Sequence, residues 1–158
     1  MAETPGGDDV QALLDRLRIR ELQAAYGDIV TRQAWPELVP LFHPTASITL
    51  DLRGAEPVRL VGPVELGHFI RDAVARFEFF EFALLNTVID QLDGDAARGR
   101  LYMWELRHLA ATGEWSNAFG LYQDEYSRLD GRWVFTARRY SSLARVGDTA
   151  TVFPLPPM

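Results

Sequence analysis

Apolar residues recur at steps of three and four through the first part of the chain. The series comprises Val10, Leu13, Leu14, Leu17, Leu22, Ala25, Tyr26, Ile29 and Val30. This spacing predicts one apolar stripe along one face of a long helix, and Asp8 or Asp9 can cap its N-terminus. A second, short helix is expected over residues 35–42, because Pro36 suits a first turn and Pro40 limits the length.

The pattern then changes to the alternation that is typical of strands. Residues 46–50 alternate with period two and are β-branched at several positions, and residues 58–62 form a second short segment of this kind. Pro63 opens a third predicted helix that runs to about Phe77. Four longer strand segments follow between turns, over residues 79–90, 97–108, 116–129 and 132–143. The dipeptide Asp130-Gly131 is a strong hairpin signal between the last two.

Helices that precede a long run of strands predict an α+β fold. With 158 residues the chain fits one core, which we assign to a domain over residues 8–145. Residues 1–7 are expected to form a flexible leader, and residues 146–158 a C-terminal tail without periodic signal. A curved antiparallel sheet that buries one face against three helices encloses an interior, so this arrangement also predicts an apolar pocket.

Charge and composition exclude several classes of function. The net charge of −6 opposes binding to a phosphate backbone, so no nucleic-acid partner is expected. The absence of cysteine removes disulfides, thiol nucleophiles and thiolate metal sites. No apolar run reaches the roughly 20 residues that span a bilayer, and the first ten residues are acidic and polar. The expected compartment is therefore the cytoplasm, with no membrane partner.

Three segments carry a resemblance to a known family. They read IRELQAAYGDIVTRQAWPELVPLFHPTA from Ile19, NTVIDQLDGDAARGRLY from Asn86 and YSRLDGRWVFTARRY from Tyr126. In their order and spacing they resemble SnoaL-like proteins of the NTF2-like superfamily, over residues 10–145. The resemblance implies a cone-shaped barrel, in which three helices from the N-terminal half wrap a curved antiparallel sheet around an apolar pocket.

The branch that the chain most resembles includes bile-acid dehydratases, scytalone dehydratase and a hexachlorocyclohexane dehydrochlorinase. The resemblance implies a cofactor-independent lyase, isomerase or cyclase that acts by acid/base chemistry. Its substrate would be a hydrophobic polycyclic, polyketide, steroid or terpenoid-like molecule. The same fold also hosts proteins that only bind, because a fold does not fix a function. A non-catalytic small-molecule-binding or partner protein is therefore the alternative.

The catalytic residues of those relatives do not transfer directly. In the dehydratase branch a carboxylate on the first helix orients an imidazole base, and the corresponding positions here hold Thr31 and Phe82. Isomerase relatives place a base near the end of the first strand, which corresponds to Leu50. The neighbouring Asp51 is one residue out of register and would face the other side of the strand. Thr31, Phe82 and Leu50 are therefore expected at the substrate pocket without a role in proton transfer.

Strand alternation supplies other candidates. Met103 and Glu105 continue the apolar face of their strand, and burial of that carboxyl should raise its pKa unless a partner compensates. The resemblance agrees, because Glu105 corresponds to an aspartate that lines the pocket of bile-acid dehydratases. By the same alternation Asn86 faces inward on its strand, and Arg139 follows an apolar series on the last strand as a counter-charge.

These residues define the predicted site. Glu105 is the expected acid or base with Tyr26 as hydrogen-bond donor, while Asn86 or Arg139 polarises a substrate oxygen. Further substrate contacts are expected from Phe82, Thr31, Leu50 and Met103. The other interpretation is a structural ion pair between Glu105 and Arg139. No motif for a nucleotide, a serine triad or zinc is present, so neither metal nor cofactor is expected.

Assembly is also predicted. Tyr102, Trp104 and Tyr122 are expected on strand faces that would otherwise meet water, and exposed aromatic patches usually mark an interface. A homodimer or homotrimer through the sheet is therefore expected.

Overall fold

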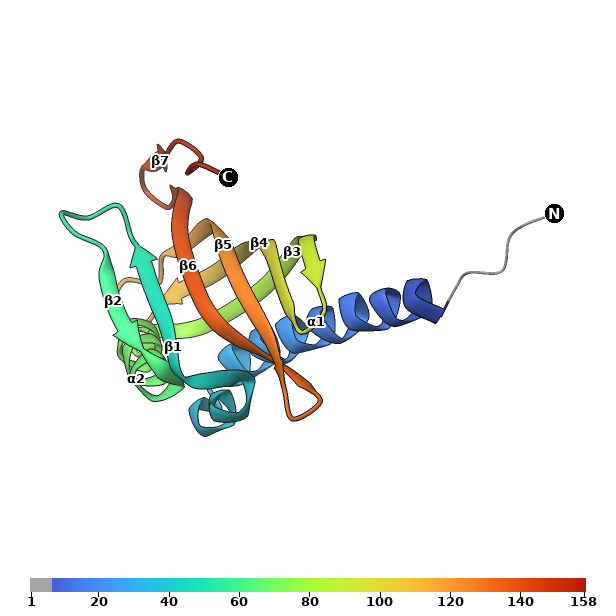
Figure 1. The fold of residues 1–158 in the computed structure, drawn as a ribbon. Helices are drawn as coiled ribbons and strands as arrows, with labels where there is room; N and C mark the ends of the chain where they lie inside the picture. The colour runs from blue at the N-terminus through green and yellow to red at the C-terminus, as the bar shows by residue number, and fades with distance from the viewer. Residues whose placement is uncertain (1–6) are drawn as a thin grey trace.

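A seven-stranded sheet curls around helix α1 (Gly7–Arg32) in the computed structural model, which describes residues 7–158 (Figure 1). The other elements are the 3-10 helix η1 (Trp35–Leu41), strands β1 (Phe42–Asp51) and β2 (Val58–Val61), helix α2 (Gly62–Val74), and strands β3 (Phe77–Asp93), β4 (Ala96–Leu109), β5 (Trp115–Leu129), β6 (Arg132–Val146) and β7 (Ala150–Val152). The predicted α+β class and the three helices are thus confirmed. The expected leader, residues 1–7, lies outside the described residues except for Gly7, which begins α1.

The strand order is β2-β1-β6-β5-β4-β3, with β7 paired to β6. β1 runs parallel to β6, whereas the other pairs are antiparallel. The curved sheet is therefore mixed: it is antiparallel, as predicted, except at the β1–β6 pair, because β1 joins a strand far along the chain and local patterns carry no sign of that pairing. The sheet remains open, since β2 and β3 form its two edges. Part of the predicted tail forms β7.

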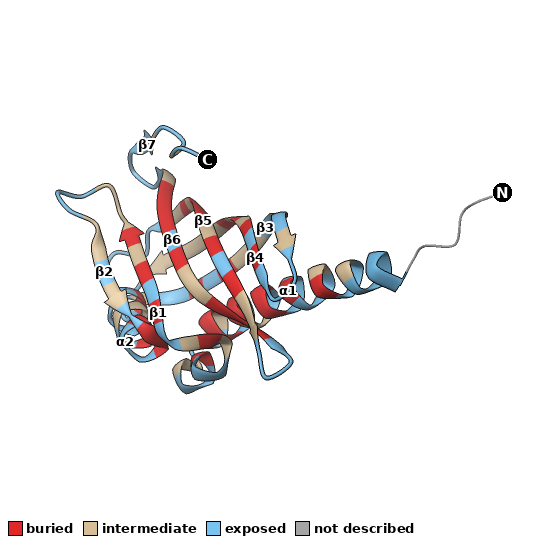
Figure 2. Ribbon diagram, in the orientation of Figure 1, coloured by how far each residue is buried: buried red, intermediate tan, exposed pale blue. Residues whose placement is uncertain are grey.

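Only the second half of the predicted apolar stripe on α1 is buried. Leu22 and Tyr26 lie in the core, whereas Leu13 and Leu17 are 67% and 53% exposed. The first turns of α1 project past the sheet, and burial begins further along the helix (Figure 2). Among residues 7–158 no helix is long and apolar enough to cross a membrane.

Asp15 links α1 to the hairpin formed by β5 and β6. Its carboxylate accepts hydrogen bonds from Trp133 Nε1 at 3.0 Å and from Arg128 Nη1 at 2.9 Å. Burial by itself would raise the pKa of Asp15, but the bonds from Trp133 and Gln11 and the charge of Arg128 bring that pKa below its ordinary value. The carboxylate is therefore held ionised, and it fixes the helix that carries Tyr26.

Candidate active site

A cavity of about 380 Å³ lies between α2 and the inner face of the curled sheet. Its apolar walls are Leu50, Leu52, Leu66, Phe69, Ile70, Ala73, Val74, Phe77 and Phe80. Its polar residues are Tyr26, Glu105, Tyr122 and Tyr140, together with Arg76, Arg107 and Arg145. Apolar walls with a few convergent polar groups are typical of small-molecule sites, and this volume is within their usual range.

Glu105 supplies the carboxyl group of this cavity. It lies on β4, and its side chain is 19% exposed. Arg107 is two residues further along the same strand and donates to Glu105 Oε2 through Nε at 2.9 Å. Burial raises the pKa of Glu105, and the charges of Arg107 and Arg145 offset that rise only in part. The carboxyl therefore holds its proton more tightly than an exposed glutamate does, which suits a group that exchanges protons with a bound molecule.

Three tyrosines line the cavity beside Glu105. The rings of Tyr26 and Tyr122 are 6.1 Å apart, and those of Tyr122 and Tyr140 are 5.0 Å apart, measured between centroids. Burial raises the pKa of all three, and for Tyr140 the pKa is about 12, with the nearby Glu105 charge as the second cause. The phenols therefore keep their protons at neutral pH and can donate hydrogen bonds to a bound molecule.

The position of Tyr140 depends on Gly120. A Cβ atom at residue 120 would overlap the ring and the hydroxyl of Tyr140, so only glycine leaves room for that ring. We expect Gly120→Ala to lower the free energy of unfolding by about 1–3 kcal/mol and to shift Tyr140. Chemical denaturation measures the first effect. Gly54→Ala is the matched control, because a Cβ there meets open space; equal curves for the two variants would contradict this account.

A buried ion pair lies behind the tyrosines. Arg138 on β6 and Asp124 on β5 are fully buried, and two guanidinium nitrogens of Arg138 donate to the two carboxylate oxygens at 2.8 Å each. The guanidinium carbon also lies 4.2 Å from the ring centroids of both Tyr26 and Tyr122. The Arg138 charge lowers the pKa of each of these phenols against the larger effect of burial, which makes their hydroxyls stronger donors than burial alone would allow.

The ion pair continues as a chain of hydrogen bonds through the core. Tyr126 donates its hydroxyl to Asp124 at 3.1 Å and accepts from Gln23 Nε2 at 2.7 Å, and Thr87 donates to Gln23 Oε1 at 3.0 Å. This network connects α1, β3, β5 and β6. Because buried polar groups are costly unless they are paired, it fixes the relative position of those elements.

Two of the predicted site residues face away from the cavity. Asn86 is exposed, because an irregular register between Leu84 and Thr87 reverses the alternation of β3 and turns Thr87 inward instead. Arg139 is exposed on the outer face for a similar reason. A bulge in β6, near the Glu125–Tyr126 step of β5, brings Arg138 to the inner face one residue early. The predicted pair of Glu105 and Arg139 is therefore replaced by Glu105 and Arg107.

The remaining predicted residues differ in whether they line the cavity. Leu50 lines the cavity with Glu105 and Tyr26. Met103 is buried beside them on β4 but is not part of the lining. Thr31 and Phe82 meet each other outside the lining: the main-chain nitrogen of Phe82 donates to Thr31 Oγ1 at 3.1 Å, and Thr31 donates to the carbonyl oxygen of Phe82 at 3.3 Å.

Sequence reasoning missed the tyrosines of the sheet and the buried ion pair. Tyr122, expected to face water, is buried in the cavity wall, because it lies opposite the inward Leu101 of β4. Tyr102 and Trp104 do face the outer side and are half-buried, so the expected homodimer or homotrimer stays a prediction. The sequence contains one sign of the Arg138–Asp124 pair, namely an acidic and a basic residue on neighbouring predicted strands. The burial of the pair depends on the bulge in β6, which the sequence does not reveal.

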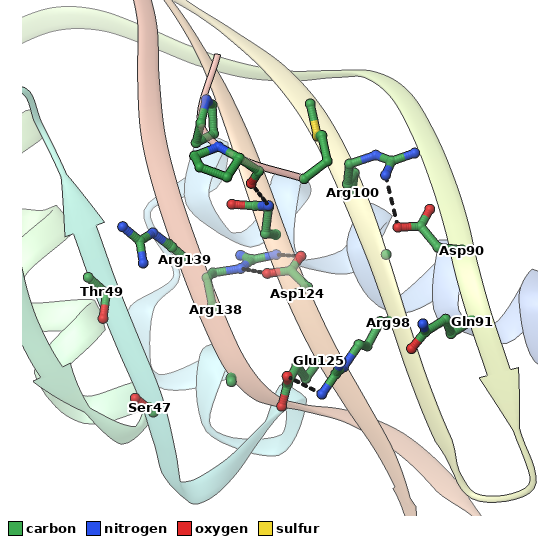
Figure 3. Close-up of a pocket in the computed structure, with 16 residues that line it drawn as sticks. Ser47, Thr49, Asp90, Gln91, Arg98, Arg100, Asp124, Glu125, Arg138 and Arg139 are labelled. Carbon is green, nitrogen blue, oxygen red and sulfur yellow. Dashed lines mark hydrogen bonds and ion pairs between the residues drawn. The ribbon is translucent and has the colours of Figure 1, made fainter. Parts of the chain in front are cut away.

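A second hollow of about 610 Å³ lies on the opposite face of the sheet, beside residues 156–158 (Figure 3). Its charged side chains largely neutralise one another: Arg98 pairs with Glu125 at 3.1 Å, and Arg100 with Asp90 at 3.0 Å. These side chains are in contact with water, which screens them. The larger hollow therefore offers weaker acid/base chemistry than the apolar cavity around Glu105.

Comparisons with known proteins agree with this fold. The sequence profile of the SnoaL-like domain matches residues 11–139, and no curated protein matches the chain. The solved hexachlorocyclohexane dehydrochlorinase LinA-type3 from Novosphingobium barchaimii LL02 is 20% identical with a TM-score of 0.76, over 94% of this chain and 99% of its own.

Two structures from Novosphingobium aromaticivorans DSM strains have the same fold. A candidate scytalone dehydratase is 16% identical with a TM-score of 0.72, over 91% of each chain. An NTF2-like protein with a cystatin-like fold is 19% identical with a TM-score of 0.70, over 89% of this chain and 92% of its own. At these identities the likeness concerns the fold.

Proposed function

This chain belongs to the SnoaL-like domain family, and we propose that it is a cofactor-independent acid/base enzyme that works in the cavity between α2 and the sheet. The reaction would be a lyase, isomerase or cyclase reaction on a hydrophobic polycyclic, polyketide, steroid or terpenoid-like molecule. The similarity to a dehydrochlorinase and to a candidate scytalone dehydratase supports an elimination in particular.

One observation carries the proposal: the raised pKa of Glu105 inside an apolar cavity. A structural carboxylate that is well paired in the core has a lowered pKa, as Asp15 does. Glu105 has an arginine partner, and burial nevertheless raises its pKa. An enzyme gains from that arrangement because a base of this kind accepts a proton readily.

The proposed step divides the work between the carboxyl and the phenols. Glu105 removes a proton from a substrate carbon, and the protonated carboxyl then delivers it to a leaving oxygen or to another carbon. Tyr140 and Tyr122 donate hydrogen bonds to the substrate oxygen on which negative charge develops. Tyr26 supports this from α1, since its ring lies next to Tyr122 and the Arg138 guanidinium.

A second function is supported by a specific observation. The positions that hold an Asp/His dyad in the dehydratase branch hold Thr31 and Phe82, which bond to each other through a hydroxyl and the main chain. A chain that had lost catalysis and kept its cavity would have this arrangement. A protein that binds the same apolar molecules without converting them is therefore the alternative.

The test is a screen of steroid, polyketide and terpenoid libraries against the wild type and Glu105→Gln. Native mass spectrometry detects bound molecules, and chromatography of the same mixtures detects conversion. We expect ligands that bind both proteins and products that form only with the wild type. Binding to both proteins without any conversion would support the alternative function.

A further inference from the structure

The cavity carries more positive than negative charge. Three arginines, Arg76, Arg107 and Arg145, line it against a single carboxylate, Glu105. The whole chain has a net charge of −6, so this site has the opposite sign to its surroundings. A positive site on an acidic protein favours the entry of an anionic ligand over a neutral one.

The three guanidinium groups come from separate elements. Arg76 follows α2, Arg107 lies on β4 and Arg145 lies near the end of β6. Aromatic rings support them: the guanidinium carbons of Arg76 and Arg107 are 5.0 Å and 5.5 Å from the centroid of the Phe77 ring. Arg145 is 5.8 Å from the ring centroid of Phe153 and donates to the carbonyl oxygen of Leu52.

The internal partners leave part of this charge uncompensated. Arg107 pairs with Glu105, and both Arg107 and Arg145 act on that same carboxylate through their charge. No ion pair joins Arg76 or Arg145 to a carboxylate within residues 7–158. Both residues are exposed, so these two guanidinium groups mark where the cavity meets solvent.

We propose that the substrate carries a carboxylate, which Arg76 and Arg145 bind at the mouth while its apolar body enters the cavity. Guanidinium groups match the planar geometry of a carboxylate and can donate two parallel hydrogen bonds to it. This inference rests on the proposed function and adds a direction to it. The anionic end stays at the arginines, and the reacting carbon lies deeper, near Glu105 and the tyrosines.

The test compares two probes that differ only in the anion, 2-naphthaleneacetate and 2-naphthaleneethanol. Isothermal titration calorimetry gives their dissociation constants for the wild type, for Arg76→Gln/Arg145→Gln and for Arg71→Gln. Arg71 is the matched control, because it also lies on the α2 side of the molecule but pairs with Asp72 and is not part of the cavity lining.

We expect the wild type to bind the carboxylate about tenfold more tightly than the alcohol, and the double variant to lose that preference. Arg71→Gln should keep the preference for the carboxylate. Added salt should weaken the binding of the carboxylate probe and leave the binding of the alcohol unchanged. Equal affinity of the wild type for both probes would overturn the inference and leave the proposed function intact. If neither probe bound to the wild type, the inference would be overturned, and the result would count against the cavity as a ligand site. Conversion that survives Glu105→Gln overturns only the proposed function.

Discussion

Asp124→Asn is expected to lower the free energy of unfolding by about 3–5 kcal/mol, the largest loss that we predict for a single conservative change. Asp124 and Arg138 are fully buried and joined by two hydrogen bonds. The variant leaves the guanidinium charge in the core without an anion, where its desolvation is no longer compensated. It also weakens the bond from Tyr126, which links the pair to α1 through Gln23. Urea denaturation at neutral pH measures the change.

Glu125→Gln is the matched control for that experiment. Glu125 is the next residue on β5 and pairs with Arg98, but both side chains are more than half exposed, so its loss should cost less than about 1 kcal/mol. Adding Arg138→Met to Asp124→Asn should restore much of the lost stability, because no unpaired charge then remains. Equal, small losses for Asp124→Asn and Glu125→Gln would show that the ion pair does not support the core.

Glu105→Gln is expected to lower kcat by about 10²–10⁴ for any molecule that the wild type converts. The amide has the shape of the protonated carboxyl but cannot accept a proton at neutral pH. The apolar walls and the tyrosines are unchanged, so the dissociation constant should change far less than the rate. Steady-state and single-turnover kinetics on a substrate from the library screen separate these two effects.

Glu81→Gln provides the control for the charge change. Glu81 lies on β3, next to the strand that carries Glu105, and its side chain is exposed and not part of the cavity lining. Its replacement should leave both kcat and binding close to the wild-type values. If Glu105→Gln converts substrate as fast as Glu81→Gln does, the proton passes through another group.

The sequence predicted the site best where the sheet is regular. β4 and β5 pair from Ala96 to His108 without a register shift. The alternation of β4 therefore continues from its apolar residues to Glu105, which the structure places in the cavity. On β3 and β6 the same reasoning failed one residue away from a bulge, so that Asn86 and Arg139 face outward.

A bulge adds one residue to a strand and reverses every side chain that follows. Its position depends on pairing with a neighbouring strand, which a single segment of sequence does not reveal. Tyr122 shows a related difficulty, because the register of its strand is set at a turn. Its face depends on whether it lies opposite Leu101 or a neighbouring residue, and the loop between β4 and β5 sets that register. A shift by one residue would have placed Tyr122 on the outer face, as was predicted.

The pKa of Glu105 also has a consequence for stability. A carboxyl whose pKa is raised in the folded protein binds its proton more tightly there than in the unfolded chain. The contribution of Glu105 to the free energy of unfolding is therefore fully present below the unfolded pKa. It falls as the pH rises through the folded pKa, and above that value the ionised cavity carboxylate is a net cost. Such a pH dependence of the free energy of unfolding is expected of a residue that serves catalysis and not stability.

The most direct measurement is a titration of the Glu105 side-chain carboxyl followed by carbon-13 NMR, with Glu105→Gln used to assign the resonance. It needs no substrate, and it reports on the one group on which the account depends. We predict a midpoint above 4.5, the ordinary value for glutamate. The midpoint should shift again when the Arg107 charge is removed by substitution. A midpoint at or below 4.5 would contradict the account, because Glu105 would then be a structural partner of Arg107.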